Sequence, residues 1–277
     1  MPTPLPTLSG NRLQLWPIIR EAMAFPWQYR HALWKWVVVC GVLVGLTDFA
    51  AETFGTHDIV KENGPLEHIY DLVFSMLQLA LILFLYTVFC IRCHRLVLLG
   101  ATPETDVFPP QIGEREGSFC RFLVIIYGSI FSIFFCGAVF VPIFLLFWGI
   151  SDTGYEEWPL FSLSMIPFSY ILGRYCMVFP ATAVDLQPSF KWAWEQSKGI
   201  GWRLGVLAGI LPWSLSFIYK GGSVYFGLDQ YQFTYSLITG LLWFAVTTIE
   251  VAVLSIAFRE LSRADICAWT GVRRSTS

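Results

Sequence analysis

Six apolar runs separated by short polar stretches dominate the pattern of the chain. They are Leu33 to Ala51, Leu72 to Ile91, Phe122 to Ile150, Leu160 to Phe179, Leu204 to Ile218 and Phe233 to Phe258. Most of them reach the ~20 residues that a helix needs to cross the hydrocarbon core of a bilayer. The fifth run is the shortest, and Pro212 within it makes its ends hard to place. The pattern therefore predicts an all-α, polytopic transmembrane bundle of six spans.

Two shorter segments have the pattern of amphipathic helices that lie in the headgroup layer. Residues 188–199 place apolar side chains on one face of a helix and charged side chains on another. The first face consists of Phe190, Ala193 and Trp194, and the second of Lys191, Glu195 and Lys198. Trp on one side of a short helix and Lys on the other is typical of an interfacial helix. Residues 12–25 have a similar pattern, with Trp16, Ile19 and Met23 at helical spacing.

The basic residues indicate how the bundle is oriented. With six spans, all Lys and Arg residues except Lys61 and Lys220 fall on one side of the membrane. Short cytoplasmic loops are enriched in Lys and Arg, so this side is expected to be the cytoplasm. We expect both termini there, in a bacterial inner membrane. The single membrane domain, 1–277, then comprises a cytoplasmic or interfacial segment (1–31), the bundle (32–258) with interfacial helix 188–199, and a cytoplasmic tail (259–277).

Composition agrees with this architecture and restricts the partners. Hydrophobic residues make up 55% of the 277 residues and charged residues only 14%, whereas soluble domains carry about 25% charged residues. The net charge is −2 and no basic block is present, so a nucleic-acid partner is not expected. The expected partners are membrane lipids, together with a protein partner or a second copy within the membrane.

Two charged residues interrupt the apolar runs. Arg174 lies in the fourth run, and Glu250 lies in the sixth, nine residues before Arg259. Nine residues of helix rise roughly 13 Å, which places Glu250 in the inner leaflet at a depth similar to that of Arg174. Charges at such depth usually face a partner or a wet cavity. We therefore expect an intramembrane ion pair, which serves either as a buried strut or as part of a proton or substrate path.

Other motifs offer little support for catalysis or a cofactor. Cys90, Cys93 and His94 fit the C-x-x-C-H pattern of covalent haem attachment. The pattern lies on the expected cytoplasmic side at the end of an apolar helix, whereas haem attachment needs the opposite side, so we expect no haem. The residues lack a second pair at zinc spacing. No phosphate-binding loop, zinc-protease motif or nucleophile elbow occurs, and an enzyme is not expected.

Small residues predict where helices approach closely. Gly41 and Gly45 form one G-x-x-x-G motif, and Gly205 and Gly209 form another. Such motifs allow close helix contact, which we assign first to packing within the chain and second to dimerisation. Displacing the chain by 168 residues aligns Gly41 with Gly209. The match reflects either a repeat of an interfacial helix followed by a span hairpin, or the general use of Trp, Lys and Gly where helices enter a membrane.

Two stretches resemble a broad group of bacterial six-span membrane proteins of uncharacterised function. The group is similar to the membrane domain fused to some glycerophosphodiester phosphodiesterases. The first stretch runs from 93 to 103, where Cys93 replaces the group's aromatic residue and Ala101 its Glu, and the second runs from 174 to 203. The positions that carry the resemblance are His94, Arg95, Gly100, Pro180, Asp185, Trp194 and Arg203. The resemblance implies six helices with interfacial segments and no established reaction.

These patterns favour a non-catalytic, multi-pass inner-membrane protein that organises lipids or partner proteins. The alternative is a small transporter or permease subunit that uses the Arg174–Glu250 region. A transporter should contain a polar cavity that reaches the middle of the membrane. An organiser should be tightly packed or open sideways to lipid.

Overall fold

The structure, a computed structural model, describes residues 13–54, 64–100, 113–147, 158–225 and 231–274. Within these ranges the chain is helical, apart from short turns, and contains no strand. The elements are α1 (Leu15–Gln28), α2 (Arg30–Phe54), α3 (Gly64–Leu99), α4 (Glu114–Phe147), α5 (Trp158–Tyr175), α6 (Val178–Ala183), α7 (Phe190–Gln196), α8 (Gly201–Gly205), a π-helical segment η2 (Val206–Ile210), α9 (Leu211–Tyr225) and α10 (Gln232–Arg274).

Four helical segments in the described residues are long and apolar enough to cross a membrane. They are Arg30–Ala51, Leu72–Leu99, Gly201–Ile218 and Gln232–Ser262. They coincide with the first, second, fifth and sixth expected spans, so the protein is a helical membrane protein. The third and fourth expected spans coincide with α4 and α5. Many side chains of these two helices lie outside the described residues, and a total of six spans stays a prediction.

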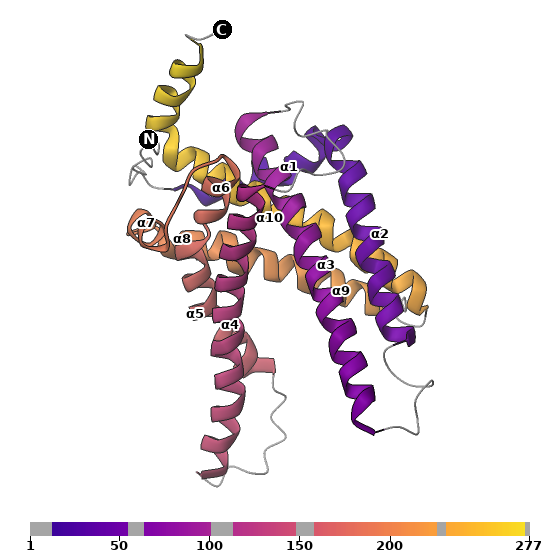
Figure 1. Cartoon of the computed structure of the whole chain (residues 1–277). Helices are drawn as coiled ribbons and strands as arrows, with labels where there is room; N and C mark the ends of the chain where they lie inside the picture. The colour runs from indigo at the N-terminus through magenta and orange to yellow at the C-terminus, as the bar shows by residue number, and fades with distance from the viewer. Residues whose placement is uncertain (1–12, 55–63, 101–112, 148–157, 226–230, 275–277) are drawn as a thin grey trace.

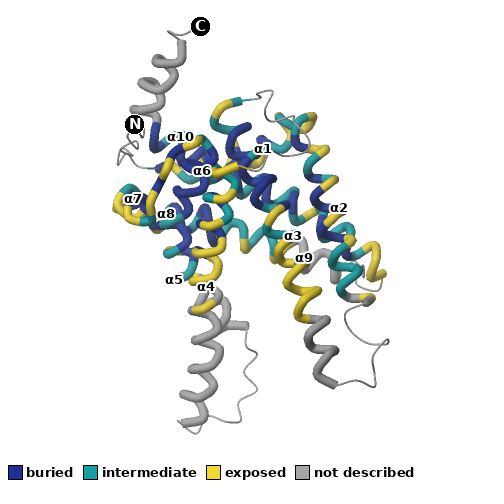
Figure 2. Tube along the Cα trace, in the orientation of Figure 1, coloured by how far each residue is buried: buried dark blue, intermediate teal, exposed yellow. Residues whose placement is uncertain are grey.

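The helices meet at one end of the bundle. Figure 1 shows α4 and α5 diverging from α2 and α3, while α10 passes through the centre. The last helix packs against α1, α2 and α3, and α6 packs against α3 and α4. Buried positions concentrate around α6 and the neighbouring turns of α3 and α10 (Figure 2). This joint is therefore where polar groups can be held away from both water and lipid.

Glycines set the closest helix contacts, as the G-x-x-x-G motifs predict. On α10, a Cβ atom added to Gly240 would lie 2.3 Å from the carbonyl oxygen of Gly41 on α2. A Cβ atom added to Gly45 would lie 2.7 Å from the carbonyl oxygen of Ser236. Only a hydrogen atom fits at these positions, which confirms that the first motif packs within the chain.

The second motif packs in the same manner. A Cβ atom on Gly205 would lie 2.8 Å from the carbonyl oxygen of Ser169 on α5, and one on Gly209 would lie 2.4 Å from the Ser169 Cβ. The first residues of α3 and α10, Gly64 and Gln232, are 168 residues apart. This displacement aligns Gly41 with Gly209, but the two motifs themselves are 164 residues apart, so a repeat stays a prediction.

The structure corrects the expected ends of two spans. The fourth run is not one helix to Phe179, because α5 ends at Tyr175 and a turn precedes α6. Arg174 therefore lies in the last turn of α5 and not within a continuous span. Helix α10 continues to Arg274, so most of the segment expected as a tail after residue 258 is helical.

Pro212 explains why the fifth span is irregular. Proline has no backbone N–H, and its ring clashes with the carbonyl four residues earlier in an α-helix. The π-helical segment η2 lies immediately before this proline and widens the backbone there. The span can thus continue from α8 into α9 without a break.

The helix in the segment expected as interfacial helix 188–199 is shorter than predicted. Helix α7 covers Phe190–Gln196, and the Ser189 hydroxyl caps it by accepting a hydrogen bond from the Trp192 backbone N–H at 3.1 Å. Trp192 and Ala193 are buried, whereas Trp194 is 41% exposed. The Trp194 ring also contacts α5, since its centre lies 5.5 Å from that of Tyr175 and 4.0 Å from the Arg174 guanidinium carbon, and an interfacial role for this helix stays a prediction.

Candidate functional site

Arg174 and Glu250 are not brought together. The Arg174 guanidinium donates hydrogen bonds to the carbonyl oxygens of Ser197 at 3.0 Å and Trp194 at 2.7 Å. Its central carbon also lies 4.0 Å from the centre of the Trp194 ring. Among the described residues, no ion pair joins Arg174 to Glu250. The expected ion pair is therefore not formed.

Arg174 instead fastens the end of α7 to α5. The last carbonyl groups of a helix lack partners within the helix and carry partial negative charge. A guanidinium satisfies such groups well because its N–H donors form a rigid, planar fork. The Ser197 hydroxyl oxygen lies 3.1 Å from the Arg174 carbonyl oxygen and 2.8 Å from that of Ala193, either of which can accept its proton. Since Arg174 is only 5% exposed, this joint is closed to solvent.

The two stretches that carry the family resemblance meet in space. Arg95 on α3 donates to the Ala183 carbonyl oxygen at 3.1 Å and to the Asp185 carboxylate at 3.0 Å. The Arg115 Nε on α4 lies 2.8 Å from the other Asp185 oxygen. Asp185 adopts a left-handed backbone conformation with φ of +65°, which is uncommon for residues other than glycine. One carboxylate thus ties α3, α4 and the turn after α6 together.

Three other positions of that resemblance lie in or next to short helices and helix ends. Pro180 is buried within α6, and Gly100 ends α3 with φ of +79°. Arg203 on α8 donates to the Leu13 carbonyl oxygen at 2.9 Å and so joins α8 to the segment before α1. In this structure these residues hold helix ends together.

Glu250 lines a cavity of about 470 Å³, a volume that includes its opening. The described lining comes from α3, α4, α5, α6, η2, α9 and α10 and is largely apolar. Its polar members are Tyr86, Cys90, His94, Tyr127, Cys176 and Glu250. The volume of about 470 Å³ includes open space; the enclosed part is about 40 Å³, which has room for a few water molecules or one small polar group.

The positions of the lining residues along the cavity follow from helix periodicity. Tyr86, Cys90 and His94 are four residues apart on α3, and Phe119, Leu123 and Tyr127 are four residues apart on α4. Residues at this spacing share one helix face. The two helices run in opposite directions (Figure 1). Tyr86 and Tyr127 therefore lie towards one end of the cavity and His94 and Phe119, whose ring centres are 6.0 Å apart, towards the other.

Glu250 lies with the two tyrosines. Tyr86 and Tyr127 are both close enough to Glu250 for electrostatic interaction. Within the part of the chain that the structure describes, the Glu250 carboxyl group makes no hydrogen bond and no ion pair. Tyr127 lines the cavity and is also 44% exposed, so its side chain extends from the cavity to the outer surface of α4.

His94 is fixed by α10. Its Nδ1 lies 2.6 Å from the Ser255 hydroxyl oxygen, and that hydroxyl donates to the Val251 carbonyl oxygen at 2.7 Å. A hydroxyl group has only one proton to donate. In the neutral ring, Nδ1 must therefore carry a hydrogen and donate to Ser255, which leaves Nε2 as a hydrogen-bond acceptor.

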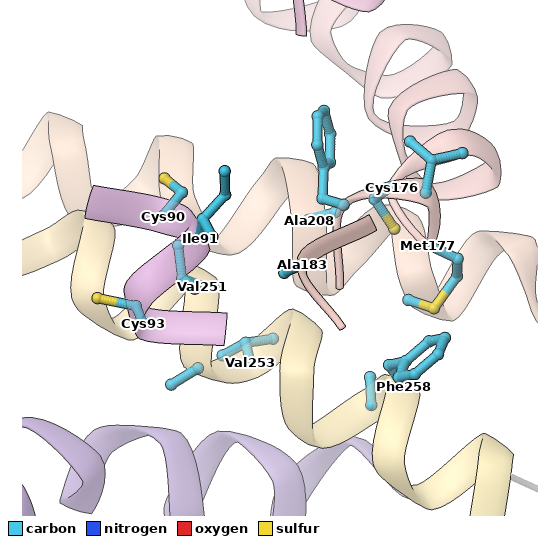
Figure 3. Packing of buried hydrophobic residues seen from close by; sticks show 14 of the residues in the cluster. Cys90, Ile91, Cys93, Cys176, Met177, Ala183, Ala208, Val251, Val253 and Phe258 are labelled. Atoms are coloured by element: carbon cyan, nitrogen blue, oxygen red, sulfur yellow. The ribbon is translucent and has the colours of Figure 1, made fainter. Parts of the chain in front are cut away.

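The C-x-x-C-H residues do not fit covalent haem. Cys90 lines the Glu250 cavity, whereas Cys93 lines a separate pocket with Leu33 and Trp36. Both thiols are 1% exposed, and Figure 3 shows them on successive turns of α3 within apolar packing. Two thioether bonds to one haem need both sulfurs at the same edge. Within the described residues, no three His, Cys, Asp or Glu side chains are grouped to hold a metal ion.

Sequence reasoning identified Glu250 and His94 but missed the tyrosines and Ser255. The four-residue spacing of Tyr86, Cys90 and His94 was the available signal, because it marks a polar stripe on an apolar helix. Comparison of the chain with protein-family models, curated proteins and solved structures finds no match.

Proposed function

We propose that this is a non-catalytic, multi-pass protein of the bacterial inner membrane that organises lipids. It has six spans and both termini in the cytoplasm. It accepts one small polar group of a lipid molecule into the Glu250 cavity from the side. The observation that carries the proposal is the position of Tyr127, which lines the cavity and is 44% exposed on α4 next to Val124 at 49% and Ile125 at 44%. In a bilayer, such side chains face acyl chains.

The ends of the helices support a role at the lipid surface. α1 is fastened to α10 by Arg259, which lies 2.6 Å from the Glu21 carboxylate. α7 is fastened to α5 by Arg174. Both helices present exposed tryptophans, Trp16 at 73% and Trp194 at 41%, which favour the headgroup layer. We expect both helices to lie in the cytoplasmic headgroup layer.

The closed inner end of the cavity favours a binding role over a transport role. Phe119 and Phe179 line the cavity at this end with ring centres 5.0 Å apart, and His94 packs beside Phe119. A path to the cytoplasm would have to pass this aromatic layer. A bound molecule would therefore enter and leave through the bilayer.

Lipid retention in native mass spectrometry tests the proposal. Ala208 in η2 lines the cavity and is 8% exposed, so Ala208→Phe should fill the space. Ile210 lies in the same segment and is 38% exposed, so Ile210→Phe is the matched control. The wild type and Ile210→Phe should retain one lipid molecule that Ala208→Phe loses. Equal retention by all three proteins would refute the proposal.

A transporter that uses Glu250 without Arg174 is the second candidate. The observation in its favour is that Glu250 lines an intramembrane cavity and is paired with no cation among the described residues. Proteoliposomes under an imposed membrane potential should reveal proton flux that Glu250→Gln abolishes if this candidate is correct. The lipid-organising proposal expects equal, background flux from both proteins.

A further inference from the structure

We infer that the Glu250 cavity binds the ammonium group of an amphiphile, whose chain leaves past Tyr127 into the bilayer. The inference rests on the proposed function and adds the chemistry of the ligand. It starts from the Glu250 carboxyl group, which has no hydrogen-bond or ion-pair partner among the described residues. A carboxylate within a membrane is costly unless a cation or a hydrated cavity compensates it. A ligand ammonium supplies that cation.

The other polar groups of the cavity suit a donor of hydrogen bonds. The bond between His94 Nδ1 and Ser255 leaves Nε2 as an acceptor. The Tyr86 and Tyr127 hydroxyls can accept as well as donate. An ammonium group carries only donors, so the Glu250 carboxylate and the two phenol oxygens, which share one end of the cavity, are complementary to it, while Nε2 lies at the other end.

Aromatic rings around Glu250 add to this selectivity. Tyr86 and Trp243 are stacked, with ring centres 5.8 Å apart and an angle of 18° between the planes. Tyr127 contributes a further ring to the lining at this end of the cavity. Aromatic faces attract ammonium groups, most strongly where water is excluded.

The same lining disfavours an anionic headgroup. No Lys or Arg is among the described residues that line the cavity. Arg174 is engaged by the carbonyl groups at the end of α7, and Arg95 is engaged by Asp185 and Ala183. A phosphate in the cavity would meet Glu250 without a compensating cation. The cavity therefore favours a positively charged ligand group and disfavours a negatively charged one.

Binding of two matched probes tests the inference. The protein is placed in nanodiscs of phosphatidylglycerol, which has no ammonium group, and binding of carbon-14-labelled dodecylammonium and dodecanol is measured. Binding by empty nanodiscs is subtracted. The wild type should bind dodecylammonium at least tenfold more tightly than dodecanol. Glu250→Gln, which preserves shape, should lose this preference, whereas Glu195→Gln on the exposed side of α7 should keep it.

Further variants separate the inference from the proposed function. Tyr127→Phe retains the ring but removes the hydroxyl, and should weaken dodecylammonium binding two- to fivefold. Ala208→Phe should abolish binding of both probes. If the wild type shows no preference for dodecylammonium but Ala208→Phe still blocks both probes, the ammonium inference fails and the lipid-binding proposal stands. If Ala208→Phe changes nothing, both fail.

Discussion

Replacing Arg174 should show that this residue joins α7 to α5 and does not form an ion pair with Glu250. Arg174→Met removes two hydrogen bonds from a charged donor, to the Trp194 and Ser197 carbonyl oxygens. Each such bond contributes about 1.5–3 kcal/mol. The stacking on Trp194 at 4.0 Å adds about 0.5–1 kcal/mol. Because methionine refills part of the buried volume, we expect the free energy of unfolding to fall by about 3–5 kcal/mol.

The assay is reversible unfolding in mixed micelles of increasing sodium dodecyl sulfate content, followed by tryptophan fluorescence. Arg174→Lys keeps the charge but not the planar fork, and should lose about 1–2 kcal/mol. A double-mutant cycle with Glu250→Gln decides between the two roles. Residues without shared contacts add within about 0.5 kcal/mol. A coupling energy above about 1 kcal/mol between Arg174 and Glu250, or a loss below about 1 kcal/mol in Arg174→Met, would refute the reasoning.

Three further predictions follow from other contacts. Gly240→Ala should lower the free energy of unfolding by at least about 2 kcal/mol because its Cβ would lie 2.3 Å from the Gly41 carbonyl oxygen. Gly128→Ala, with no neighbour within 4 Å, should not destabilise the protein. Equal effects of the two substitutions in the same unfolding assay would contradict the packing of α2 on α10. Asp185→Ala should destabilise more than Asp185→Asn, because asparagine tolerates the φ of +65°, and the reverse order would exclude that explanation. Nitrogen-15 solid-state NMR should find the His94 hydrogen on Nδ1, with a shift towards the other tautomer in Ser255→Ala; a hydrogen on Nε2 in the wild type would contradict the assignment.

The sequence was informative wherever a property repeats along a helix. Apolar runs located the spans now described as α2, α3, α8 to α9 and α10, because twenty consecutive apolar residues have few other uses. The motif of Gly41 and Gly45 located the contact with α10, because a flat helix face needs small residues four apart. Both features are local, so they can be read without knowing the fold.

The Arg174 contact could not be predicted in the same way. Its partners are backbone carbonyl groups of Trp194 and Ser197, and every residue has such a group. Backbone carbonyl groups therefore carry no signal in a sequence, whereas charged side chains do. This is why Glu250 was expected to be the partner of Arg174. The break after Tyr175 was hidden as well, because the apolar run continues through the turn to Phe179.

Contacts between residues far apart in the sequence could not be predicted either. His94 and Ser255 are 161 residues apart, and Arg95 and Asp185 are 90 apart. The resemblance contained both stretches that meet at Asp185, yet nothing in either stretch indicates the other. The cavity around Glu250 collects side chains from seven elements, and only the packing of the helices places Tyr86 and Tyr127 beside it.

An experimental map of the protein in lipid nanodiscs, at a resolution that shows side chains, tests the central claim most directly. We expect elongated density that enters the cavity beside Tyr127, contacts Glu250 and is continuous with the surrounding lipid. The map should also show Arg174 against the end of α7. A cavity filled by protein side chains, with Glu250 paired to Arg174 and no entering density, would contradict the account.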